Sequence, residues 1–152
     1  MLEDFPRSCR SWLLPFDIRA EEANAILFGE SAVMKYMLLI YGEEKALTDD
    51  VRGPCYEEST RLAHELRASG KYLAANPLHP TSTATIVRIR DGKPLVTDGP
   101  FAETREQLGG YFLVNAQNLD EAISIARRIP AATWGTVEIR PVLEIPGLPA
   151  DA

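Results

Sequence analysis

"TATIVRIRDGKPLVTDGPFAETREQLGGYFLVNA", residues 83–116, contains three strand-like segments in succession. Residues 83–90 and 93–97 are rich in Thr, Val and Ile, and only Asp91-Gly92 separates them. That dipeptide is typical of a two-residue hairpin turn in which both central residues have positive φ. Residues 111–116 form the third segment. We therefore expect a β-hairpin, a connection and a further strand.

The connection is rich in turn residues. Asp98-Gly99-Pro100 ends the hairpin, and Pro100 fixes its own φ for a change of chain direction. Gly109-Gly110 lets the backbone bend tightly, so we expect the strand to resume at Tyr111. Phe101 and Leu108 are expected to anchor this connection to the core.

The elements before the hairpin are predicted from periodicity. Residues 35–41 form a strand, and residues 72–75 form a short strand that stops at Asn76-Pro77. Between them, Pro54 suits the first turn of a helix, and Gly70 suits its C-terminal end. The apolar stripe of this helix consists of Cys55, Ser59, Leu62, Ala63 and Leu66.

A second helix and a last strand follow the hairpin. Asn118 caps the helix with Glu121 three residues on, as in a capping box, and Pro130 stops it. Residues 136–142 form the last strand. The order β-α-β, hairpin, β-α-β predicts an α+β fold, a ferredoxin-like split βαβ with an extra hairpin.

The first strand is apolar on both faces, although two helices cover only one face of such a sheet. A second copy of the chain is the simplest cover for the other face. We therefore expect a homodimer whose sheets face each other and enclose a cavity lined partly by polar side chains.

Composition narrows the class of protein. The chain has 152 residues, of which 45% are hydrophobic and 25% charged, as in a soluble one-domain protein. Its net charge of −6 argues against nucleic acid as a partner. Cys9 and Cys55 lack metal-binding spacing and indicate free thiols in a reducing, cytoplasmic compartment. With only His64 and His79 as histidines, we expect no metal site. No apolar run approaches the length of a membrane span, so we expect none, and we also expect no cofactor.

The chain divides into three segments. Residues 1–33 form an N-terminal extension without the features of a secretory signal, residues 34–145 form the domain, and residues 146–152 form a tail. Because "MKYMLLIYG" opens the domain as a natural first strand, we hypothesise that translation begins at Met34.

Asp98 is the candidate catalytic residue. It stands at a strand end, where a carboxylate can point into a cavity mouth, and Arg88 and Arg105 are its candidate partners. A carboxylate held by Arg has a depressed pKa and can orient a ligand or act as a base. The structural alternative, common for Asp at turns, is that Asp98 caps the backbone N–H groups after Gly99-Pro100.

Four residues are candidates for ligand binding. Arg88 and Arg105 would bind a small anionic or polar ligand, and Tyr41 and Tyr111 would present hydroxyl groups to the same cavity. The alternatives are solubilising charges for the arginines and core packing for the tyrosines.

The segments "MKYMLLIYG", "TATIVRIRDGKPLVTDGPFAETREQLGGYFLV", "LDEAISIARRIP" and "VEIRPV" together resemble the YCII-related family in its DGPF branch. The resemblance implies a dimeric α/β barrel of ferredoxin-like subunits. DGPF members are often encoded near extracytoplasmic-function sigma factors, and their biochemical role is undetermined. The His–Asp pair proposed for the YciI branch has no counterpart here, because Ser59 and Ala68 stand near its positions.

Three functions stay open from the sequence. The first is ligand binding in a cavity near the DGPF loop, and the second is acid–base or lyase-type catalysis in that cavity. The third is a regulatory role linked to extracytoplasmic-function sigma factors. A structural dimer module without a pocket is a weaker alternative.

Overall fold

The computed structural model describes residues 33–100, 102, 104–145 and 148. Of the proposed extension 1–33, only residue 33 lies within this range. Phe101 and most of the tail 146–152 also lie outside it. The helices and strands, in chain order, are β1 (Met34–Gly42), α2 (Asp49–Ala68), β2 (Tyr72–Pro77), β3 (Thr85–Arg90), β4 (Lys93–Asp98), β5 (Gln107–Ala116), α3 (Leu119–Ala126) and β6 (Thr136–Pro141). Short 3-10 turns are η2 (Glu44–Ala46), η3 (Thr81–Thr83) and η4 (Pro130–Thr133).

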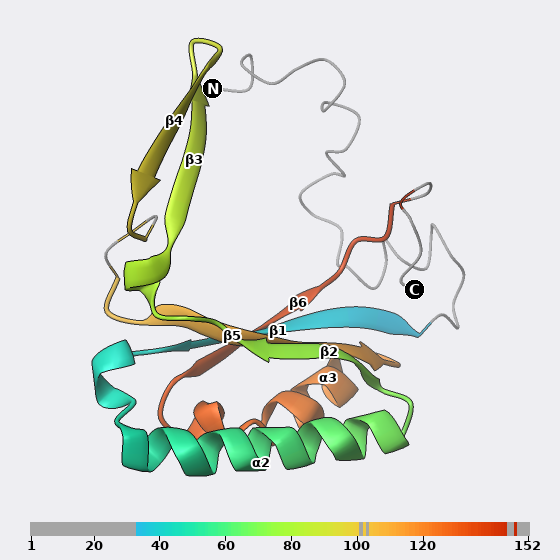
Figure 1. The fold of residues 1–152 in the computed structure, drawn as a ribbon. Helices are drawn as coiled ribbons and strands as arrows, with labels where there is room; N and C mark the ends of the chain where they lie inside the picture. Colours follow the sequence, from blue (N-terminus) through green and yellow to red (C-terminus); the bar gives the residue numbers. More distant parts are fainter. Residues whose placement is uncertain (1–32, 101, 103, 146–147, 149–152) are drawn as a thin grey trace. The chain divides into compact units, whose positions relative to one another are not determined.

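The main sheet has the strand order β2-β5-β1-β6, and all neighbouring strands are antiparallel. Helices α2 and α3 both lie on one face of this sheet (Figure 1). With the hairpin set aside, this is the expected ferredoxin-like arrangement of α and β elements. The predicted α+β fold is therefore confirmed. Within the described residues, no helix is long and apolar enough to cross a membrane.

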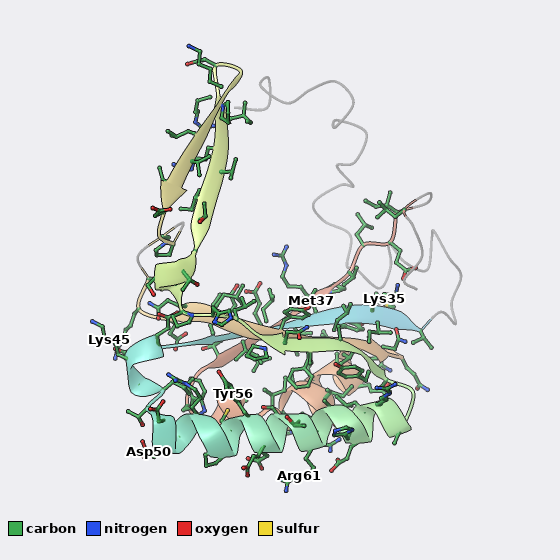
Figure 2. All side chains as sticks on the ribbon, viewed as in Figure 1. Lys35, Met37, Lys45, Asp50, Tyr56 and Arg61 are labelled. Atoms are coloured by element: carbon green, nitrogen blue, oxygen red, sulfur yellow. The ribbon has the colours of Figure 1, made fainter. Side chains whose placement is uncertain are left out.

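Strand β1 shows how the sequence sets the two faces of the sheet. Tyr36 and Leu38 are fully buried under the helices, whereas Lys35 and Met37 are half-buried. Figure 2 shows Lys35 and Met37 on the side of the sheet away from α2. The side chains of the core come from the sheet's helix side and from both helices. Its buried members are Met34, Tyr36, Leu38, Leu62, Leu66, Phe112, Val114, Ala116, Ala122, Ile125, Ala126, Ile129 and Ala131.

Helix α2 begins at Asp49, so Pro54, which was expected in the first turn, lies further inside the helix. Its first turn is acidic, and Asp49 pairs with Arg52 at 3.0 Å, which stabilises an earlier start. The predicted end is confirmed: Gly70 has φ +71, and the N–H of Lys71 donates to the carbonyl of Leu66 at 2.8 Å.

Strand β5 begins at Gln107, four residues before the predicted start at Tyr111. Gly109-Gly110 therefore lies within the strand and is not a bend before it. Gly110 pairs with Ile40 on one side and Pro77 on the other. A Cβ on Gly110 would stand 2.9 Å from the backbone oxygen of Asn76, so the close approach of β2 requires this glycine.

Two further local predictions are confirmed, whereas α3 ends at Ala126, before Pro130, which was predicted to stop it. Asp91 and Gly92 have φ values of +50 and +73, as the two-residue hairpin turn requires. The N–H of Glu121 donates to Asn118 Oδ1 at 3.0 Å at the start of α3. Strands β3 and β4 form their own two-stranded sheet, which stands on the side of the main sheet opposite α2 and α3 (Figure 1).

Candidate functional site

A cavity of about 470 Å³ lies between α2 and the sheet, and we call it the helix–sheet cavity. Its walls come from α2, from the ends of β1, β2 and β5 that lie nearest the start of α2, and from η4. The apolar and aromatic residues of its lining are Ile40, Leu47, Tyr56, Ala63, Tyr72, Ala75, Pro77, Tyr111, Phe112, Ala131 and Trp134. The polar and charged ones are Glu43, Glu44, Cys55, Ser59, Thr60, His64, Arg67 and Asn76.

Helix α2 contributes a row of small side chains to the cavity. Cys55, Ser59 and Ala63 are spaced four residues apart, so they lie on one face of the helix, and all three are half-buried. One turn later, Leu66 fills the same interface and is buried. Space for a ligand therefore opens where the helix carries a thiol, a hydroxyl and a methyl group in place of large apolar side chains. Figure 2 shows Tyr56 directed from the same part of α2 toward the sheet.

The sheet side of the cavity is also built from small residues. Gly110 and Ala75 stand beside Phe112, which is buried and supplies an aromatic surface. Small residues on both walls account for the separation between helix and sheet.

Trp134 closes one end of the cavity. A Cβ on Gly42 would lie 2.3 Å from Cζ3 of Trp134, so the ring rests directly on the glycine backbone. A second hollow, of about 700 Å³ but with fewer lining residues, shares Glu43 and Trp134 with the cavity. Its other lining residues are Ala46, Val51, Thr104, Arg105 and Glu106. Trp134 thus separates the helix–sheet cavity from a hollow beside residues 104–106, which precede β5.

The cavity contains one ionisable thiol. Burial raises the pKa of Cys55, the negative charge of Glu58 raises it further, and a hydrogen bond with Ser59 opposes both effects. At neutral pH the thiol is therefore protonated and is a weak nucleophile.

The carboxylate of Glu44 accepts hydrogen bonds from the N–H and the hydroxyl of Thr81, at 2.7 and 3.0 Å, which holds η3 against η2.

Asp98 and Arg88 lie on opposite faces of the hairpin. Asp98 is opposite Thr85 at the base of the hairpin, and Arg88 is opposite Leu95 three positions along β3. Asp98 is exposed and lines neither the helix–sheet cavity nor the second hollow. The N–H of Gly99 next to it donates to the carbonyl of Ala84 at 2.8 Å, which closes the base of the hairpin.

The other three predicted residues are divided between different sites. Tyr111 is among the residues around the helix–sheet cavity, but by alternation its side chain lies on the other face of the sheet, opposite Leu39, where its hydroxyl accepts a hydrogen bond from Asn76 Nδ2 at 3.1 Å. Arg105 lines the second hollow. Tyr41 is opposite Thr136 near the end of β1 and lines neither space. The structure therefore does not bring Tyr41, Asp98 and the two arginines together.

The lining residues Cys55, Ser59, Tyr56 and Trp134 were not among the predicted site residues. Small polar side chains within an apolar helical stripe were the available signal, since Cys55 and Ser59 alternate there with larger residues. Trp134 gave no such signal because its role depends on Gly42, 92 residues away in the chain. Among the described residues, no three His, Cys, Asp or Glu side chains are grouped so as to hold a metal ion.

Comparison with known proteins identifies relatives of the whole domain. The model of the YCII-related domain matches residues 34–146. A protein of Rhizobium meliloti (strain 1021), described as uncharacterised, is 36% identical over 118 residues. That alignment covers 72% of this chain and 92% of the relative.

Proposed function

The chain belongs to the YCII-related family, and we propose that it binds a small molecule in the helix–sheet cavity. The lining of the cavity carries this proposal. A volume of about 470 Å³ suits a small organic ligand, and a mostly apolar lining with a few polar groups is typical of ligand sites.

The lining also indicates the chemistry of the ligand. Phe112 and Trp134 would pack against an apolar or aromatic part of the ligand, and the hydroxyl of Ser59 would form a hydrogen bond with a polar group of the ligand. His64 and Arg67 lie on the last turns of α2 and line the same cavity, so they would bind an acidic group of the ligand. This agrees with the expected small anionic or polar ligand, with an apolar part added.

Within the family, we assign the chain to the DGPF branch, because residues 98–110 read "DGPFAETREQLGG". We also propose the homodimer with facing sheets that this resemblance implies. The half-buried residues Met37, Leu39 and Leu113 on the sheet face opposite the helices support this proposal, since they are apolar and α2 and α3 cover only the other face.

Binding is favoured over acid–base catalysis by Asp98, the predicted catalytic residue, because of the position of its carboxylate. A general base needs its substrate within hydrogen-bond reach, and Asp98 stands outside both described cavities. The thiol of Cys55, which lines the cavity, has a raised pKa and is therefore protonated at neutral pH.

The proposal is tested by a thermal-shift screen of small carboxylic acids, with hits confirmed by calorimetry. Ala63→Phe places a phenyl ring in the cavity and should abolish binding, whereas Ala68→Phe adds the same ring at an exposed position of α2 and should not. A bound ligand should also protect Cys55 from iodoacetamide in a Cys9→Ser background. Binding that survives Ala63→Phe unchanged, with Cys55 unprotected, would place the ligand elsewhere.

A further inference from the structure

The charged residues of the helix–sheet cavity are separated along α2. Glu43 and Glu44 lie where β1 leads into the helix. His64 and Arg67 lie on its last turns. From Cys55 to Arg67 alone the helix axis rises about 18 Å, so the acidic and basic groups stand at opposite ends of the lining. This arrangement orients an anionic ligand with its acidic group toward Arg67 and its apolar part toward the start of α2.

The apolar part of such a ligand points toward Trp134, whose indole has a defined position. The ring rests on Gly42, the last residue of β1, where a Cβ would overlap Cζ3 of the indole. The N–H groups of Trp134 and Gly135 both donate to the carbonyl of Ala131, at 3.3 and 2.8 Å. A Cβ on Gly135 would overlap the carbonyl oxygen of Tyr41, so the backbone is closely packed here as well. The ring therefore closes this end of the cavity at a fixed place.

More space lies on the other side of the ring. The second hollow, of about 700 Å³, shares Glu43 and Trp134 with the helix–sheet cavity, and its apolar lining also includes Ala46 and Val51. A ligand that the ring did not stop would extend into this hollow. The indole of Trp134 thus limits how far a ligand reaches from Arg67.

We propose that Trp134 sets the maximum length of the ligand, which is a carboxylic acid with an apolar chain. The carboxylate pairs with Arg67, and the chain lies along α2 until its end contacts the indole. Each methylene that the cavity buries raises the affinity about fourfold, which is about 0.8 kcal/mol. This rise ends at the ring, because a longer chain must bend or leave its end in water. The inference rests on the proposed function and adds the shape of the ligand and the residue that selects it.

Calorimetry with straight-chain acids from butanoic to hexadecanoic acid, each below its critical micelle concentration, tests the limit. In the wild type we expect the affinity to reach a maximum at an intermediate chain length. Trp134→Ala joins the two spaces, so its maximum should move to an acid at least two methylenes longer, which it binds at least tenfold more tightly than the wild type does. Val51→Phe is the matched control, since Val51 lines only the second hollow. Alone it should leave the maximum unchanged, and combined with Trp134→Ala it should restore the wild-type maximum.

Fluorescence gives a readout that keeps the ring. Trp12→Phe leaves Trp134 as the only tryptophan of the chain. Its emission should shift to shorter wavelength only with acids long enough to reach the indole, beginning near the length of highest affinity.

The outcomes separate this inference from the proposed function. A maximum that Trp134→Ala leaves in place, or bound acids that never shift the emission, overturns the length limit and retains the proposed function. A wild type that binds hits of the thermal-shift screen but no straight-chain acid also overturns the limit alone. A wild type that binds neither the hits nor any acid of the series overturns both.

Discussion

Substituting Gly110 by Ala tests whether the double glycine is needed for sheet packing. The new Cβ would stand 2.9 Å from the backbone oxygen of Asn76 and 3.2 Å from Cα of Pro77. Backbone atoms cannot rotate away, so β2 must move outward from β5. Such overpacking costs about 1–3 kcal/mol, and lower unfolded-state entropy returns about 0.4–1 kcal/mol. We expect a net loss of about 1–2 kcal/mol, or about 2–8 °C in Tm.

The neighbouring glycine is a matched control. A Cβ on Gly109 would have the backbone oxygen of Ile40 as its nearest atom, at 4.0 Å, and Gly109 is exposed. Gly109→Ala should therefore be neutral or stabilise the fold by up to about 1 kcal/mol. Urea denaturation of both variants and the wild type measures the free energies of unfolding. The error of additivity between sites is about 0.5 kcal/mol. If the free energies of unfolding of Gly110→Ala and Gly109→Ala differ by less than this, the close approach of β2 does not require a glycine at position 110.

Three further predictions concern local interactions. The pKa of Glu121 is held below its usual value first by Lys71, whose Nζ lies 2.6 Å from Glu121 Oε1, and then by a hydrogen bond from the N–H of Gln117. The contribution of this carboxylate to stability is therefore present above about pH 4.3 and is lost as the pH falls through its lower folded-state pKa. The stability difference between wild type and Glu121→Gln should thus shrink from pH 6 to pH 3, and a constant difference would contradict this assignment. Because burial raises the pKa of Cys55, iodoacetamide should alkylate it more slowly at pH 7.5 than free cysteine, with a rate that rises with pH; equal rates would refute the burial. Asn118→Ala should lower the free energy of unfolding by about 1 kcal/mol through loss of the cap on α3, and an unchanged urea midpoint would show that the cap is dispensable.

Local signals in the sequence predicted local structure well. The glycine at the end of α2, the Asp91-Gly92 turn and the Asn118 cap each depend on hydrogen bonds between residues only a few positions apart. The alternation in β1 was equally informative, because its buried face is set by the period of the strand. The order of these elements was enough for the α+β fold.

Features that depend on distant residues were harder to predict. The early start of β5 reflects pairing of its first residues with the end of β1, across more than 60 positions of the chain. The cavity depends on the volumes of Ala63, Gly110 and Trp134, which come from three separate elements. One relation was nonetheless available: a two-residue turn pairs Arg90 with Lys93 and so places Arg88 on the face opposite Asp98.

The cavity and the β3–β4 hairpin make separate demands on the fold. Small residues on α2 and β5 lower the amount of core that these elements bury where the cavity opens. The hairpin adds exposed apolar surface on the other side of the sheet. Both features reduce the apolar area that an isolated chain buries on folding.

The most direct test of the proposed function is a crystal structure of the protein grown with the strongest hit from the thermal-shift screen. We predict electron density for the ligand between Ser59 of α2 and Phe112 of β5, with its acidic group toward Arg67. A ligand bound outside this cavity, with helix and sheet side chains closing the space between them, would contradict the proposed function.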